Sequence, residues 1–189
     1  MGWKEVAVTA MLLSAPVGHG GGGSTPPGWR ELAAAGTSYD EAERNAAAEA
    51  VEALSKPVRQ RASDALAAMA GAAPGAEGLQ SAHDALVAAL SGLEAPDAAF
   101  SGEGPNRKVL KRAGVMVLHG LVAREARRLA QSPQPDAEAS ALLRTLEGLK
   151  GVDAKARNRL KEEARQGLGD ALYLRALPQA GSTQDRRSP

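Results

Sequence analysis

The sequence predicts an all-α fold, an irregular helical bundle of about five to seven helices with flexible N- and C-terminal tails. Three observations support this prediction. The 189-residue chain is rich in alanine, the strongest helix former. Apolar residues recur at the three- and four-residue spacing of amphipathic helices. Clusters of glycine, proline and serine interrupt that pattern at short intervals, which indicates separate helices joined by turns.

Charge divides the chain into two opposed parts. Residues 1–100 contain 6 Lys/Arg and 12 Asp/Glu, a net charge of −6, whereas residues 101–189 contain 17 and 10, a net charge of +7. The net charge of +1 for the whole chain hides this asymmetry. The predicted organisation is a helical domain over residues 29–177, with an acidic half over 29–95 and a basic half over 105–177, followed by a disordered tail over 178–189.

The first 28 residues leave two alternatives open. Residues 1–20 combine a charged start, a short apolar run and small residues, which is the layout of a signal peptide. Glu5 and the polar interruptions of the run favour an N-terminal tail or short helix instead. We expect a secreted or periplasmic protein if residues 1–20 are a signal peptide, and a cytoplasmic protein otherwise. The run is too short for a transmembrane segment.

Glycines and prolines dominate residues 18–28, which is typical of a linker. No GK[ST] motif follows these glycines, so they do not indicate a phosphate-binding loop.

Three helices are predicted in the acidic half. Ser38 and Glu41 have the spacing of a capping box, so we expect the first of these helices to begin after Ser38. Ser55, followed by Lys56-Pro57, predicts a second helix over residues 56–70. Ser81 is the expected cap of a third helix, whose leucines form one stripe.

The longest predicted helix opens the basic half and covers residues 107–131. Its middle, residues 113–123, is apolar nearly all round, so we expect it to be the most buried element. Its valines and glycines also fit a strand, but the charged helix formers on both sides favour a helix. Gly114 and Gly120 would then allow neighbouring helices to approach closely, at about 1 kcal/mol each in helix propensity.

Two further helices complete the expected bundle. Asp136 is the expected cap of the first, which ends near Gly148. Asp153 is the expected cap of the second, which runs to about Leu177. The two halves would each contain three helices, although they share no repeated sequence.

Catalytic and metal-binding motifs are missing from the sequence. Without cysteine there are no disulfides, thiolate metal sites or cysteine nucleophiles. His19 falls in the linker, His83 is expected on the surface near a helix start, and His119 is expected to be buried and hydrogen-bonded to a neighbour. Glu162 and Glu163 are interpreted as ordinary solvated helix-surface residues. We therefore predict no enzyme activity, cofactor or metal.

A candidate contact surface lies in the basic half. Cations in the first turns of the 107–131 helix share one side, and more cations follow on the last helix. Positive charge at a helix N-terminus opposes the macrodipole, which a sequence tolerates when something acidic compensates. The acidic half, an acidic protein or a phosphate backbone could compensate. The candidate binding residues are Arg107, Lys108, Lys111, Arg112, Lys155 and Arg159.

These observations predict a non-enzymatic helical interaction or structural protein, exported if the signal peptide is real, with a basic C-terminal contact surface and a protein partner. The alternative is a small helical nucleic-acid-associated protein that uses the same basic helices. The low net charge and the lack of aromatic residues among the cations favour the protein partner.

Overall fold

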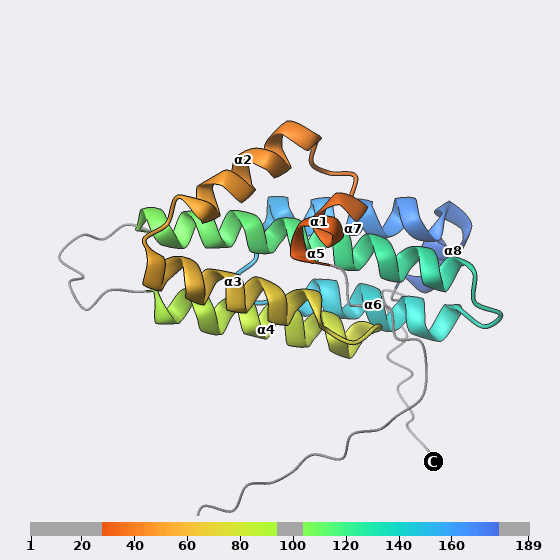
Figure 1. Ribbon diagram of the computed structural model, residues 1–189. Coiled ribbons are helices and arrows are strands. Elements are labelled where there is room, and N and C mark those ends of the chain that lie inside the picture. Colours follow the sequence, from red (N-terminus) through yellow and green to blue (C-terminus); the bar gives the residue numbers. More distant parts are fainter. Residues whose placement is uncertain (1–27, 94–103, 178–189) are drawn as a thin grey trace, which may run out of the picture.

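The computed structural model describes residues 28–93 and 104–177, and these residues form helices without any strand (Figure 1). The predicted all-α bundle is therefore confirmed. The expected signal peptide or linker and the expected C-terminal tail lie outside the described residues. Eight helices are described: α1 (Trp29–Ala35), α2 (Glu41–Glu52), α3 (Lys56–Ala70), α4 (Ala76–Gly92), α5 (Pro105–Ala130), α6 (Asp136–Gly148), α7 (Ala154–Leu168) and α8 (Asp170–Ala176).

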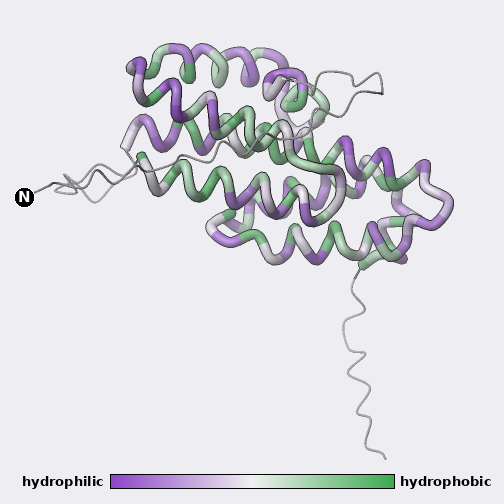
Figure 2. The backbone as a smooth tube through the Cα atoms, turned by 60° about the horizontal axis from the view of Figure 1, so that its bottom comes forward, coloured by the Kyte–Doolittle hydropathy of each residue, from purple (hydrophilic) through white to green (hydrophobic). Residues whose placement is uncertain are grey.

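The central element is α5, which has 26 residues. It runs between the α3–α4 pair and α7, and α2 crosses it obliquely (Figure 1). Every residue from Ala113 to Ala123 is buried except Val115, which is half-buried. This confirms, for the residues that the structure describes, the expectation that 113–123 is the most buried stretch. The outer helices mix hydrophobic and hydrophilic residues in short runs, as amphipathic helices do (Figure 2).

Two glycines of α5 allow the close helix approach that the sequence predicts. A Cβ atom on Gly120 would lie only 1.8 Å from the backbone oxygen of Leu32, so α1 rests directly on the α5 backbone. A Cβ atom on Gly114 would lie 2.4 Å from a terminal carbon of the Leu86 side chain. The first approach is to rigid backbone and the second to a movable side chain, so Gly120 is the more constrained position.

The predicted capping box is displaced by two residues. The cap of α2 is Asp40, whose carboxylate accepts a hydrogen bond from Glu43 N at 2.7 Å, while Glu43 Oε2 accepts from Asp40 N at 3.2 Å. Ser38 is not the cap because its hydroxyl donates to the Glu163 carboxylate at 2.8 Å. The Glu163 carboxylate, which is distant in the sequence, thus binds the Ser38 hydroxyl that the local pattern predicts to cap the helix.

Two other predicted caps are wrong. The start of α4 is at Ala76, after Gly75 turns the chain with a positive φ of 103°, so Ser81 lies inside the helix. Asp136 is the first residue of α6, and Pro135 occupies the cap position. Ser55 precedes α3 as predicted, although its hydroxyl makes no capping bond. Asp153 does cap α7, accepting from Ala156 N at 2.8 Å.

The last predicted helix is divided in two. Gly169, with a positive φ of 77°, ends α7 and turns the chain into α8. At the other end of the domain, Trp29–Ala35 forms α1, a short helix that the sequence pattern did not indicate. These two features explain why the described residues form eight helices, whereas the sequence predicts the positions of six.

Candidate basic interface and adjoining cavity

Five of the six predicted binding residues line one shallow depression with a volume of about 320 Å³. Three come from the first turns of α5 and two from the first turns of α7, and these helices pack along each other (Figure 1). Local spacing places the cations on one side of each helix, and the packing of α5 on α7 brings the two sets together. The residues of this basic depression are Lys108, Lys111, Arg112, Lys155 and Arg159.

Four of these five cations form no ion pair within residues 28–93 and 104–177. They are Lys108, Arg112, Lys155 and Arg159. By contrast, other cations of the basic half have carboxylate partners: Arg128, Lys161 and Arg175 each pair with an acid. The basic depression is therefore a concentration of positive charge that the described part of the acidic half does not neutralise.

The lining of the basic depression also includes Asp153 and Tyr39. The Asp153 carboxylate already accepts the hydrogen bond that caps α7. Tyr39 comes from the link between α1 and α2, and its ring meets that of His119 edge-on at a centroid distance of 5.2 Å. Sequence reasoning missed Tyr39, because nothing local connects it to cations that lie 69 to 120 residues further along the chain.

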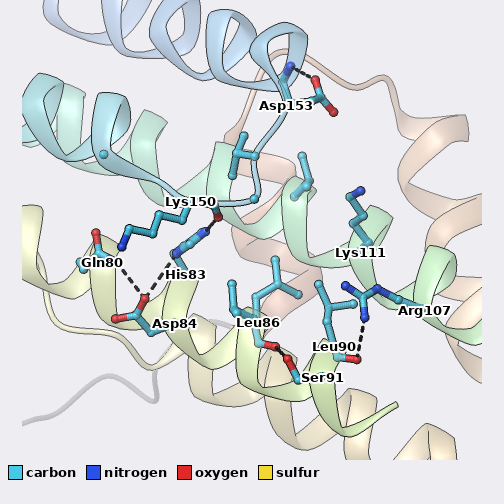
Figure 3. A pocket seen from close by; sticks show the side chains of 16 residues that line it. Gln80, His83, Asp84, Leu86, Leu90, Ser91, Arg107, Lys111, Lys150 and Asp153 are labelled. Carbon is cyan, nitrogen blue, oxygen red and sulfur yellow. Dashed lines mark hydrogen bonds and ion pairs between the residues drawn. The ribbon is translucent and has the colours of Figure 1, made fainter. Parts of the chain in front are cut away.

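Arg107, the sixth predicted residue, lines a separate cavity of about 610 Å³. This cavity, which we call the α4 cavity, lies between α4, the start of α5 and the link from α6 to α7 (Figure 3). It shares one wall with the basic depression, and the shared residues include Lys111 and Val115. Leucine side chains of α4 cover part of the interior, so the lining of the α4 cavity is mixed, with an apolar part that the basic depression lacks.

The predicted surface position of His83 is wrong. Its side chain is buried, and its Nε2 lies 2.8 Å from the Lys150 carbonyl oxygen. Because a carbonyl only accepts, Nε2 carries the hydrogen and ties α4 to the link between α6 and α7. The prediction for His83 was wrong because it assumed that the helix begins at Ser81, whereas α4 begins five residues earlier. His83 therefore lies in the second turn, on the side facing that link.

The expected burial of His119 is confirmed, whereas the predicted solvated position of Glu163 is wrong. The Glu163 side chain is 1% exposed, and its Oε2 lies 3.4 Å from His119 Nδ1. Thr37 N donates to Glu163 Oε1 at 2.8 Å and Ser38 Oγ donates to Oε2 at 2.8 Å. Neighbouring Glu162 is exposed, as the sequence predicts, and it pairs with Arg165.

Hydrogen bonding controls the ionisation of Glu163. Burial raises the pKa of the carboxyl group, but hydrogen bonds from His119, Thr37 and Ser38 outweigh this effect and lower the pKa to about 2. The carboxylate is therefore ionised at neutral pH, and it joins α7 to α5 and to the link between α1 and α2. The His119–Glu163 pair is buried from solvent, and it holds α5, α7 and the link between α1 and α2 together beneath Tyr39.

Within residues 28–93 and 104–177, no group of three or more potential metal ligands occurs. None of the helices in these ranges has the length and apolar character needed to cross a membrane. Comparisons with protein-family models, curated proteins and solved structures found no match to this chain.

Proposed function

We propose that the protein is a helical interaction protein whose basic depression binds an acidic segment of a partner protein. The observation that carries this proposal is the convergence of five cations from α5 and α7, four of which form no ion pair within the described ranges. Their mutual repulsion opposes folding, and a set of partner carboxylates would relieve it.

The structure of the bundle supports a preformed surface. α5 and α7 pack so closely that a Cβ atom on Gly167 would lie 2.5 Å from the Cβ atom of Ala126. The two helices therefore hold the backbone positions of these cations at fixed separations, so binding requires no rearrangement of the helices themselves. Arg112 and Arg159 can each hold a carboxylate through two parallel hydrogen bonds, which gives an acidic segment a defined orientation.

The small size of the cluster favours a protein segment over a nucleic acid. The depression measures about 320 Å³, whereas nucleic-acid interfaces generally spread phosphate contacts along a longer basic stripe. Tyr39 is the one aromatic residue in its lining, and its ring is engaged edge-on with His119. This leaves no row of ring faces on which successive bases could stack. Nucleic-acid association remains the alternative function, and the experiment below separates the two.

The proposal is tested by titrating the protein with a fluorescent oligoglutamate and, in parallel, with an oligothymidine of equal charge. We expect the peptide to bind more tightly at equal salt. In the variant Arg112→Glu/Arg159→Glu, we expect the affinity for the peptide to fall by about tenfold or more, because two attractions between arginine and glutamate become repulsions between carboxylates. Arg61→Glu/Arg144→Glu is the matched control, since Arg61 on α3 and Arg144 on α6 are exposed and line neither site.

An unchanged affinity in Arg112→Glu/Arg159→Glu, or an equal loss in Arg61→Glu/Arg144→Glu, would contradict binding at the basic depression. Tighter binding of the oligothymidine, with an affinity that falls steeply as salt is raised, would show that the ligand of the basic depression is a nucleic acid and not an acidic protein segment.

A further inference from the structure

We propose that the basic depression recognises a phosphorylated serine or threonine of its acidic partner segment, with the phosphate group held between α5 and α7. This inference rests on the function proposed above and deepens it, because it names the group at the centre of that segment. Three features of the basic depression carry it: the division of its lining, its small volume and the matching pairs of cations on its two helices.

The lining of the basic depression has two parts. The first is the wall shared with the α4 cavity, formed by Lys111, Val115, Asp153 and Ala156. The carboxylate of the lining lies in this wall, where Asp153 Oδ1 accepts from Ala156 N at 2.8 Å and caps α7. The second part, which we call the unshared part, contains no carboxylate and is formed by Tyr39, Lys108, Arg112, Lys155 and Arg159.

The four cations of the unshared part are available to a ligand. Their side chains are exposed, and they form no ion pair with any residue of 28–93 and 104–177. A ligand therefore does not have to displace a carboxylate from them. Lys111 already has an interaction of its own and belongs to the shared wall, so we do not assign it to the phosphate.

The small volume of the basic depression favours one strongly charged group over several weakly charged ones. Four glutamates could balance the four cations, but their carboxylates would repel one another within about 320 Å³. A phosphorylated side chain brings a charge of about −1.5 to −2 and three acceptor oxygens on one phosphorus atom. It therefore places more negative charge among the cations with less repulsion within the ligand.

The two helices present the same pair of cations. Lys108 and Arg112 are four residues apart on α5, and Lys155 and Arg159 are four residues apart on α7. Each helix thus offers one ammonium group and one guanidinium group on the side that lines the depression. A guanidinium group can bind two phosphate oxygens through parallel hydrogen bonds, while an ammonium group adds a point charge. Donors on both sides fit the three oxygens of a phosphate monoester.

The first experiment measures the affinity of the full chain for two acidic peptides by calorimetry at about pH 7.5. The peptides have identical flanks and equal charge, and the centre is one phosphoserine in the first and two glutamates in the second. We expect the phosphoserine peptide to bind at least about fivefold more tightly. Equal affinities would overturn phosphate recognition and leave acidic-segment binding intact, whereas a failure of both peptides to bind would contradict the proposed function as well.

Orthophosphate distinguishes a protein segment from a free anion as the source of the phosphate. It should bind at least about tenfold more weakly than the phosphoserine peptide, because it lacks the flanking carboxylates that meet the surrounding positive field. Orthophosphate that binds as tightly as the peptide would contradict a protein ligand.

Paired variants locate the phosphate. In Arg112→Gln/Arg159→Gln, the preference for the phosphoserine peptide over the diglutamate peptide should shrink to within about twofold, because both guanidinium groups are lost. Arg61→Gln/Arg144→Gln, exposed and outside the depression, is the matched control and should keep the preference. The two affinities are compared within each variant, so a general loss of binding does not alter their ratio. A preference that persists in Arg112→Gln/Arg159→Gln would overturn the assignment.

The pH dependence of binding provides an independent measurement. Phosphoserine gains its second negative charge at about pH 6, so affinity for its peptide should rise by about threefold or more from about pH 5.5 to 7.5. The diglutamate peptide is ionised throughout this range and should change by less than about twofold. The described lining of the basic depression contains no histidine that could impose the same trend on both peptides. Parallel profiles would contradict binding of a phosphate dianion.

Discussion

Replacing Glu163 by alanine is expected to lower the free energy of unfolding by about 3–5 kcal/mol at neutral pH. The substitution removes an ionised, buried carboxylate that accepts hydrogen bonds from His119 and from the backbone and hydroxyl groups of Thr37 and Ser38. These donors would remain without their acceptor in a region closed to water. Urea denaturation followed by circular dichroism measures the loss.

The control for this prediction is Glu162→Ala, the adjacent glutamate on the exposed side of α7. It should change the free energy of unfolding by no more than about 0.5 kcal/mol. Similar losses for the two variants would contradict the structural assignment of Glu163.

Glu163 also makes stability depend on pH in a defined window. Its pKa is about 2 in the folded chain and about 4.5 when unfolded, because the hydrogen bonds to the carboxylate outweigh its burial. The contribution of this carboxylate to the free energy of unfolding is complete above about pH 4.5. It decreases by up to about 3 kcal/mol as the pH falls toward 2. In Glu163→Gln, which does not titrate, this part of the acid dependence should be absent. Parallel curves for the two proteins between pH 4.5 and 2 would contradict it.

The second large effect is expected at Gly120, where the α1 backbone touches α5. In Gly120→Ala, the new Cβ atom would lie 1.8 Å from the Leu32 backbone oxygen and 2.5 Å from its carbonyl carbon. Neither atom can move without displacing α1, so we expect a loss of about 2–3 kcal/mol despite the better helix propensity of alanine. Equilibrium denaturation and the loss of the α1 amide protection from hydrogen exchange report the effect.

Gly92→Ala is the matched control, because Gly92 is also helical and, within the described ranges, no atom beyond its own helix backbone and chain neighbours lies within 4 Å of the added Cβ atom. This variant should be neutral or slightly more stable. A gain in stability for both variants would show that α1 does not rest on the α5 backbone.

Local sequence signals predicted the parts of the fold that depend on neighbouring residues. The bounds of α3 agree with the prediction because Ser55, Pro57 and Gly71 mark both ends of the helix. The buried middle of α5 follows from its continuous apolar composition. Even the basic depression could be anticipated in part, because the spacing of its cations within α5 and within α7 is a property of each helix alone.

Features that depend on tertiary contacts were not predictable in this way. The spacing of Ser38 and Glu41 alone predicts a cap at Ser38, yet the Ser38 hydroxyl binds Glu163, 125 residues away. His83 is bonded to a carbonyl 67 residues along the chain, which no local pattern indicates. Tyr39 joins the basic depression, and the α4 cavity forms, only because helices distant in sequence pack together.

Binding of an acidic segment at the basic depression is tested most directly by recording backbone amide chemical shifts during titration with oligoglutamate. We predict that the largest changes occur in the first turns of α5 and α7, around Lys108, Arg112, Lys155 and Arg159, together with Tyr39. Changes that are spread evenly over the surface, or that concentrate on α2, α3 and α6, would contradict it.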